Sequence, residues 1–219
     1  MLEVILGAVI AIVLTIAVET LRKPRLTLSI ASPIDKEYQD RPARDVRFLL
    51  IECQNQPLPW FARWMSRNAA LQCHGTVSFY HLDGQNVFGR SMPSRWSGTT
   101  EPAASQIILG EQRGFLIDLQ RMTIESRVDI HPGEKALLDI AAKFDEESEC
   151  YGWSNLSYLS TPVWRNPDWK LNSGRYLVRV TVMSAGEQCS GIFRLINDVQ
   201  RGDCRIEKAL QSDQVYGDI

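Results

Sequence analysis

The residues that could carry out catalysis are few in this chain, and none stands in a known catalytic motif. Three histidines are present, His74, His81 and His131. The first two are an odd number of positions apart, so on one continuous strand they would face opposite sides of a sheet. The chain has no G-x-S-x-G elbow, P-loop, G-x-G-x-x-G or H-E-x-x-H sequence. We therefore expect no catalytic residues. A thiol or hydrolytic enzyme, for example one that pairs Cys189 with His131, is the third of three hypotheses.

The cysteines do not form a metal-binding or redox motif. There are five of them, Cys53, Cys73, Cys150, Cys189 and Cys204. No two are spaced as C-x-x-C, which excludes a zinc ribbon or a thioredoxin motif. An odd number of cysteines on predicted strands fits reduced, partly buried thiols in a cytosolic domain. A disulfide such as Cys53–Cys73 is the alternative if the domain lies outside the cytoplasm. We expect neither a metal ion nor an organic cofactor.

Tryptophan and arginine residues recur in segments predicted to be loops, and they are candidates for binding a ligand or a partner. The set consists of Arg95, Trp96, Trp153, Trp164, Arg165 and Trp169. Such side chains on loops at one end of a sandwich are common in ligand and protein contacts. A ring such as a nucleotide base could stack there, with Arg95 or Arg165 supplying charge. The alternative is that the tryptophans fill the core beneath long loops.

A second aromatic segment, residues 57–67, has the composition of a membrane-interface element. In helical geometry Trp60, Phe61, Trp64 and Met65 would share one face, with Arg63 and Arg67 beside it. Tryptophan and arginine together favour docking on a bilayer that contains anionic lipid. The alternative is a helical plug that closes one end of the folded domain.

The N-terminus predicts a transmembrane helix. Residues 4–18 contain no charged side chain, and the apolar stretch extends to residues 2–21 apart from Glu3, Glu19 and Thr20. This length approaches the roughly 17–20 residues that cross a hydrocarbon core. A cleavable signal peptide is the main alternative, but such peptides open with a basic residue, and this one opens with Met-Leu-Glu. A buried core helix is a second alternative, although core helices usually have a polar face.

The charges around this helix predict its orientation. Arg22, Lys23 and Arg25 follow it, whereas only Glu3 and the terminal amine precede it. Basic residues next to a membrane span stay on the cytoplasmic side. We therefore expect a single-pass protein of the inner membrane, with the N-terminus outside, the C-terminal domain in the cytoplasm, and the lipid bilayer as the partner of residues 2–21.

Composition excludes one class of partner. The formal net charge is -2, and nucleic-acid-binding domains normally carry a basic stripe, so we expect no nucleic acid. The acidic run of residues 145–149 predicts a solvated loop, because the further oxygen ligands that a calcium site needs are absent at the required spacing.

The rest of the chain predicts a mainly β domain. Alternating or continuous apolar residues predict strands at residues 25–30, 46–53, 71–80, 115–119, 135–140, 175–183 and 191–196. Residues 91–107 predict a long loop. The expected fold is an N-terminal transmembrane helix followed by an antiparallel immunoglobulin-like β-sandwich. The expected divisions are an anchor (1–21), a juxtamembrane strand and linker (22–45), the sandwich (46–206) and a polar tail that frays (207–219).

One strand carries a resemblance to a known fold family. Leu171–Val180 reads L-x-x-G-x-Y-x-V-x-V, which resembles the penultimate strand of immunoglobulin-like sandwiches. The resemblance implies that Tyr176 bonds back to the preceding corner. Residues 48–55, followed by Ala69, Ala70 and Cys73, resemble a strand-pair pattern of uncharacterised bacterial single-pass membrane proteins with such a domain. Neither resemblance implies an activity.

Three functions remain open from these observations. The leading hypothesis is a membrane-anchored binding or effector module that recognises a protein or small ligand through its loop end. The alternative is a scaffold or assembly subunit of a membrane complex, and the enzyme described above is third. A protein partner or a homo-oligomer fits either of the first two, and Gly7 and Ala11 would permit close approach of two anchors.

Overall fold

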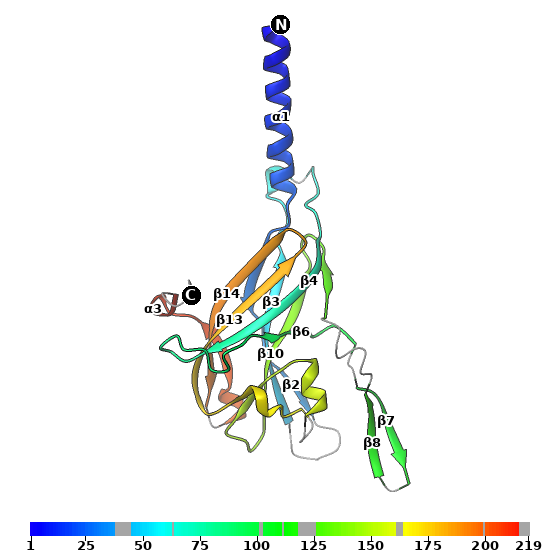
Figure 1. Cartoon of the computed structure of the whole chain (residues 1–219), viewed down its shortest axis with the longest axis vertical. Coiled ribbons are helices and arrows are strands. Elements are labelled where there is room, and N and C mark those ends of the chain that lie inside the picture. The colour runs from blue at the N-terminus through cyan, green and yellow to red at the C-terminus, as the bar shows by residue number, and fades with distance from the viewer. Residues whose placement is uncertain are drawn as a thin grey trace.

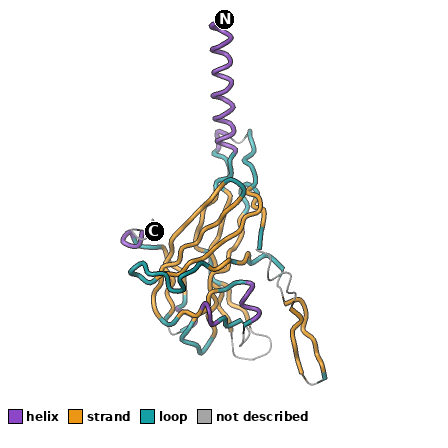
Figure 2. The backbone as a smooth tube through the Cα atoms, viewed as in Figure 1, coloured by secondary structure: helices purple, strands orange, loops and turns teal. Residues whose placement is uncertain are grey.

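A long N-terminal helix leads into a β-sandwich in the computed structural model (Figure 1). The structure describes residues 1–37, 45–62, 64–100, 103–110, 112–117, 126–160, 164–198 and 200–214. Helix α1 spans Leu2–Arg22, and strands account for most of the remainder (Figure 2). The prediction of a mainly β chain with an N-terminal apolar helix and two antiparallel sheets is confirmed.

The first sheet has the strand order β1-β3-β10-β11-β12, with β2 added beside β3 and β6 beside β10. These strands are β1 (Leu26–Ile30), β2 (Ile34–Glu37), β3 (Asp45–Asn55), β6 (Arg95–Trp96), β10 (Lys135–Phe144), β11 (Cys150–Gly152) and β12 (Lys170–Leu171). Every pairing is antiparallel. A register shift between Asp139 and Ala141 marks a bulge in β10.

The second sheet has the order β15-β14-β13-β4-β5, with β9 beside β4. Its strands are β4 (Ala70–Tyr80), β5 (Met92–Pro93), β9 (Val128–Ile130), β13 (Gly174–Ser184), β14 (Glu187–Asn197) and β15 (Arg205–Lys208). The predicted hairpin of β13 and β14 is present, and its strands pair over their whole length.

A third, two-stranded sheet consists of β7 (Ala103–Leu109) and β8 (Gln112–Ile117). Within the described residues these strands pair only with each other, and the hairpin projects from the sandwich (Figure 1). Short helical turns complete the chain: η1 (Trp60–Ala62), η2 (Asn155–Leu159), η3 (Pro167–Trp169), η4 (Arg201–Asp203) and α3 (Gln211–Gln214).

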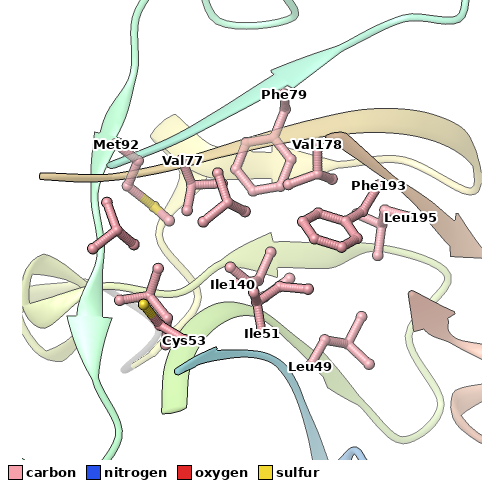
Figure 3. Close-up of a cluster of buried hydrophobic side chains, with 14 of the residues drawn as sticks. Leu49, Ile51, Cys53, Val77, Phe79, Met92, Ile140, Val178, Phe193 and Leu195 are labelled. Atoms are coloured by element: carbon pink, nitrogen blue, oxygen red, sulfur yellow. The ribbon is translucent and has the colours of Figure 1, made fainter. Parts of the chain in front are cut away.

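The main core lies between the two large sheets. Side chains of one sheet, among them Val77, Phe79 and Val178, meet those of the other, among them Ile51 and Ile140 (Figure 3). They come from alternate positions along each strand, as a strand with one buried face requires. The sheets approach closely where Gly75 faces Leu138, because a Cβ on Gly75 would lie 2.8 Å from the Leu138 methyl groups.

A second, smaller core covers part of the outer face of the first sheet. Strands β3, β10 and β11 contribute Val46, Ala142, Phe144 and Tyr151, and the segment after β11 contributes Trp153 and Tyr158.

The acidic run of residues 145–149, between β10 and β11, forms three ion pairs. Asp145 pairs with Arg201, Glu147 with Arg165 and Glu149 with Lys170. The predicted solvated loop is therefore an ion-paired turn.

The end of the sandwich remote from α1 is held by a buried lysine and a buried asparagine. Lys143 Nζ on β10 donates to Asn197 Oδ1 on β14 at 2.8 Å and to the carbonyl oxygens of Ser148 and Asp198. Asn197 Nδ2 in turn donates to the carbonyl oxygens of Ser148, Leu171 and Asn172. This network joins the two sheets, since β10 belongs to the first and β14 to the second.

The tyrosine corner implied by the resemblance is present. Tyr176 lies near the start of β13 and its hydroxyl donates to the Asn172 carbonyl oxygen at 3.1 Å. Burial raises the pKa of this hydroxyl, so it remains a donor at neutral pH.

Two segments differ from expectation. The predicted loop at residues 91–107 contains β5, β6 and the start of β7, so that prediction was wrong over most of its length. The ordered fold also continues beyond residue 206, because β15 pairs with β14 and the buried Asp213 accepts hydrogen bonds from Arg194 at 2.6 and 2.8 Å.

Replacing Tyr176 with Phe removes only the corner hydroxyl. We expect the free energy of unfolding of the full chain in detergent micelles, measured by urea titration, to fall by about 1 kcal/mol. Tyr80→Phe on the adjacent strand β4 is the matched control, because the Tyr80 hydroxyl has no hydrogen-bond partner in the described structure. That variant should change the same quantity by less than about 0.5 kcal/mol. Equal losses in both variants would contradict the corner's contribution.

Candidate functional site

The described structure contains one helix that is long and apolar enough to cross a bilayer, and it is α1. None of its apolar stretch is buried against the sandwich. A buried core helix is therefore excluded as the explanation of this segment. A membrane anchor and a signal sequence share these properties.

The aromatic segment after β3 lies beside the end of this helix. Trp60, Phe61 and Trp64 expose 79%, 59% and 80% of their surface. We call these three side chains the aromatic collar. Met65 is half-buried beside them. The collar is not the expected helix, because only Trp60–Ala62 forms a single 3-10 turn, and it does not plug the sandwich. Arg63 lies outside the described residues.

The collar is carried by residues 56–68, which we call the collar segment. Three hydrogen bonds connect this segment to the end of α1 and the start of β1. The Asn68 amide donates to the Arg22 carbonyl oxygen at 2.7 Å, and the Gln56 amide donates to the Arg25 carbonyl oxygen at 2.9 Å. Arg67 Nη1 donates to the Lys23 carbonyl oxygen. These bonds hold the backbone segment that carries the collar against the base of the helix (Figure 1). Exposed aromatic side chains and a long apolar helix therefore occupy the same end of the molecule.

The buried side chain of Asn55, at the end of β3, organises this region. Its Oδ1 accepts from the Arg25 amide at 3.1 Å, and its Nδ2 donates to the carbonyl oxygens of Asn68 and Ile130 at 3.0 Å each. One side chain thus joins the exit of α1, the end of the collar segment and strand β9.

A second candidate site is a small crevice on the outer face of the first sheet, in the half remote from α1. Its volume is about 30 Å³, room for one or two water molecules. The lining residues are Ile34, Lys36, Phe48, Leu50, Arg95, Ser97, Asp139, Trp153 and Tyr158. They come from β2, β3, β6 and the residue after it, β10 and the segment after β11.

A buried ion pair forms the polar wall of the crevice. Arg95 and Asp139 are direct partners across β6 and β10, and Arg95 Nη1 lies 3.1 Å from Asp139 Oδ2. Both side chains are 5% exposed. Arg95 Nη2 donates to the Thr99 carbonyl oxygen, whereas Nε is buried with no hydrogen-bond partner. The crevice therefore retains one unused donor on a buried cation.

Aromatic rings form the opposite wall. The Phe48 and Trp153 ring centroids lie 5.0 Å apart in an edge-to-face arrangement, and Trp164 packs edge-on against Trp153 at 5.8 Å. Trp164 adopts a left-handed backbone conformation with φ of 73°, which is costly for a bulky residue. Its contacts with Trp153 and Tyr158 hold it there. At the mouth, Lys36 Nζ lies 5.6 Å from the Phe48 ring centroid.

The six residues predicted as a loop-end binding group do not form one exposed surface. Arg95 and Trp153 line the crevice. Trp96 is buried in the main core, where its Nε1 donates to the Cys73 carbonyl oxygen at 3.0 Å. Trp169 also belongs to the main core, which corrects its placement on an accessible loop.

The last two members of that group lie at the second core. Arg165 pairs with Glu147 at 2.6 Å and stacks over the Phe144 ring at 3.8 Å, and Trp164 packs as described above. Most of the group therefore fills cores, and two members reach the crevice.

The cysteines are free thiols, four of them buried and Cys189 half-buried. Burial raises the pKa of Cys53 to about 12 and that of Cys73 to about 11, so these two thiols stay protonated and unreactive at neutral pH. Cys204 differs, because a hydrogen bond from Cys150 and the nearby Lys143 ammonium lower its pKa, against the opposing effect of burial.

Seven of the nine lining residues of the crevice were missed by the sequence patterns, among them Lys36, Phe48, Asp139 and Tyr158. An acid within the apolar run of residues 136–142 in β10 was a usable signal, since a buried carboxylate requires a partner. The others carry no local signal. Comparisons of this chain with protein-family models, curated proteins and solved structures find no match.

Replacing Arg95 with Met retains a side chain of similar length but leaves the Asp139 carboxylate buried without its guanidinium. We expect the free energy of unfolding to fall by about 3–5 kcal/mol, measured by urea titration of the full chain in micelles. The double variant Arg95→Met/Asp139→Leu removes both charges and should recover most of that loss. If the single and double variants were equally stable, the buried charge of Asp139 would not need Arg95 to offset it.

Proposed function

We propose that this chain is a single-pass inner-membrane protein whose cytoplasmic β-sandwich is a binding module held with one end against the bilayer. Helix α1 stays in the membrane as an anchor, and the aromatic collar inserts at the adjoining interface. The observation that carries the proposal is the position of Trp60, Phe61 and Trp64, exposed beside the base of an uncovered apolar helix. Tryptophan at that level of a membrane protein is characteristic of the interfacial region.

The cytoplasmic orientation is supported by charge and by the thiols. Arg22, Lys23 and Arg25 lie at the sandwich side of α1, which is the arrangement that basic residues adopt on the cytoplasmic side. All five cysteines are free, as expected in a reducing compartment.

We further propose that the crevice is the ligand-binding surface of the module. It combines the ammonium of Lys36 and the guanidinium of Arg95, which is paired with Asp139, with the rings of Phe48 and Trp153, and one buried Arg95 donor has no partner. This combination suits a small anion that carries an aromatic ring, such as a nucleotide. Because the enclosed volume is small, the anionic group would enter the crevice and the ring would lie against its mouth.

The membrane contact of the collar is testable by fluorescence. The full chain has six tryptophans, and three of them, Trp96, Trp153 and Trp169, are buried. In liposomes containing brominated phosphatidylcholine we expect quenching of tryptophan emission that disappears in the Trp60→Phe/Trp64→Phe variant. Bromine quenches only rings at the depth of the acyl chains, and these two are the rings proposed to lie there. Trp153→Phe is the control and should leave the quenching unchanged; persistent quenching in the double variant would contradict the proposal.

The crevice is testable with ribonucleoside monophosphates as the probe and saturation-transfer NMR on the full chain in nanodiscs as the measurement. We expect a signal from at least one nucleotide and a roughly tenfold weaker affinity in Lys36→Glu, because a negative charge would replace the cation at the mouth. Lys208→Glu on β15 makes the same charge change on an exposed residue of the other sheet and should have no effect. Equal weakening by both variants, or binding of no nucleotide, would contradict the ligand assignment.

A scaffold or assembly subunit is the second candidate, and the β7–β8 hairpin favours it. Among the described strands these two pair only with each other, so both edges of the hairpin are free to pair with another chain. The hairpin sequence also contains the apolar runs of residues 107–109 and 115–117. A native mass in nanodiscs equal to a multiple of the chain, together with no nucleotide binding, would favour this function over the first.

A further inference from the structure

A groove of about 280 Å³ lies next to the aromatic collar, between the start of β1 and the collar segment. Its lining residues are Arg25, Thr27, Gln56, Pro57, Pro59 and Arg67. Gln56 Nε2 donates to Thr27 Oγ1 at 2.9 Å, so the two neutral polar side chains hold each other. The two arginines supply the charge of the groove.

The positive charge of this groove has no acidic partner within the described structure. Neither Arg25 nor Arg67 forms an ion pair with a described carboxylate. Arg67 donates through Nη1 to the Lys23 carbonyl oxygen, whereas its Nε is buried without a partner. Burial and the nearby Arg25 guanidinium lower the pKa of Arg67. Two guanidinium groups that repel each other in a partly enclosed space form a site that an anion would stabilise.

We infer that this groove binds the phosphate of an anionic phospholipid from the leaflet that adjoins the collar. The inference rests on the proposed function, because it needs the collar to face the bilayer. Guanidinium groups match phosphate oxygens in geometry and in charge. The phosphate would occupy the space between Arg25 and Arg67, where the Arg67 Nε is the unused donor.

A lipid is favoured over free phosphate by what surrounds the groove. The exposed Trp60 directly follows Pro59 of the lining, and Arg67 of the lining donates to the Lys23 carbonyl oxygen at the base of α1. This is where the acyl chains of a bound lipid would need apolar contacts. Pro57 and Pro59 form an apolar side of the groove. A free anion would use only the cationic groups, whereas a phospholipid uses both kinds of contact at once.

The test is native mass spectrometry of the full chain in neutral detergent micelles, titrated with phosphatidylglycerol or with phosphatidylcholine of the same acyl chains. We expect one phosphatidylglycerol adduct that forms roughly tenfold more tightly than the phosphatidylcholine adduct. Arg25→Gln and Arg67→Gln should each weaken it roughly fivefold, since each removes one basic side chain near the headgroup. The affinity for phosphatidylcholine should fall less, because its choline cation already offsets the charge of the phosphate.

Two further variants guard against indirect effects. Arg175→Gln on β13 makes the same charge change at the end of the sandwich remote from α1 and should leave the phosphatidylglycerol adduct unchanged. Arg67→Lys keeps a cation in the groove and should retain more of the affinity than Arg67→Gln. Arg67→Gln also removes the hydrogen bond to the Lys23 carbonyl oxygen. If this loss prevents Arg67→Gln from folding, the result for Arg25→Gln decides the test.

The outcomes separate this inference from the proposed function. Equal affinity for both lipids, or equal weakening by Arg25→Gln and Arg175→Gln, overturns the site. Displacement of the adduct by inorganic phosphate at the lipid concentration overturns the choice of a lipid. Collar quenching by brominated lipid with no lipid selectivity removes only this inference, whereas absence of collar quenching removes the proposed function as well.

Discussion

The geometry of the sandwich end next to α1 depends on the hydrogen bonds of the buried side-chain amide of Asn55. It accepts from the Arg25 amide and donates to the carbonyl oxygens of Asn68 and Ile130. A buried polar group that loses its partner costs about 1–3 kcal/mol, so these three segments cannot separate independently. The exit of α1, the collar segment and β9 therefore form one unit, and the helix meets the sandwich in a defined position.

The opposite end of the sandwich is held by the same means with different chemistry. Lys143 has a buried ammonium group whose hydrogen-bond acceptors are Asn197 Oδ1 and two carbonyl oxygens. A buried cation without enough acceptors would be expelled toward water, so the chain brings β10, the turn after it and β14 to the same point. The crevice lies on the sheet between these two fixed ends. Its position relative to α1 is consequently set by the fold and not by a flexible linker.

The sequence predicted the parts of the fold that local periodicity determines. The alternation in β4 and β13 reports one buried face directly, and the corner of Tyr176 follows from a motif within a single strand. Strands of two residues such as β5 and β6 contain no period, and for that reason residues 91–107 resembled a loop. The crevice was predictable only in part, because Lys36 and Asp139 come together through pairing of strands remote in sequence. Burial of Asn55 and Lys143 likewise depends on tertiary contacts that no local pattern records.

Tertiary hydrogen bonds and solvent together determine the conformation of the collar segment. The helical spacing of its apolar residues did not predict this conformation. Residues 57–67 have apolar side chains at helical spacing, but a helix of that length is marginal without packing, and the backbone is held at both ends by Arg22 and Arg25. Burial of Trp60 or Phe61 in the sandwich would gain roughly 1.5–3 kcal/mol per side chain, yet both remain exposed. In water alone such a patch favours association. Under the proposed anchoring of α1, the same apolar surface would lie at the membrane interface, where its exposure carries no penalty.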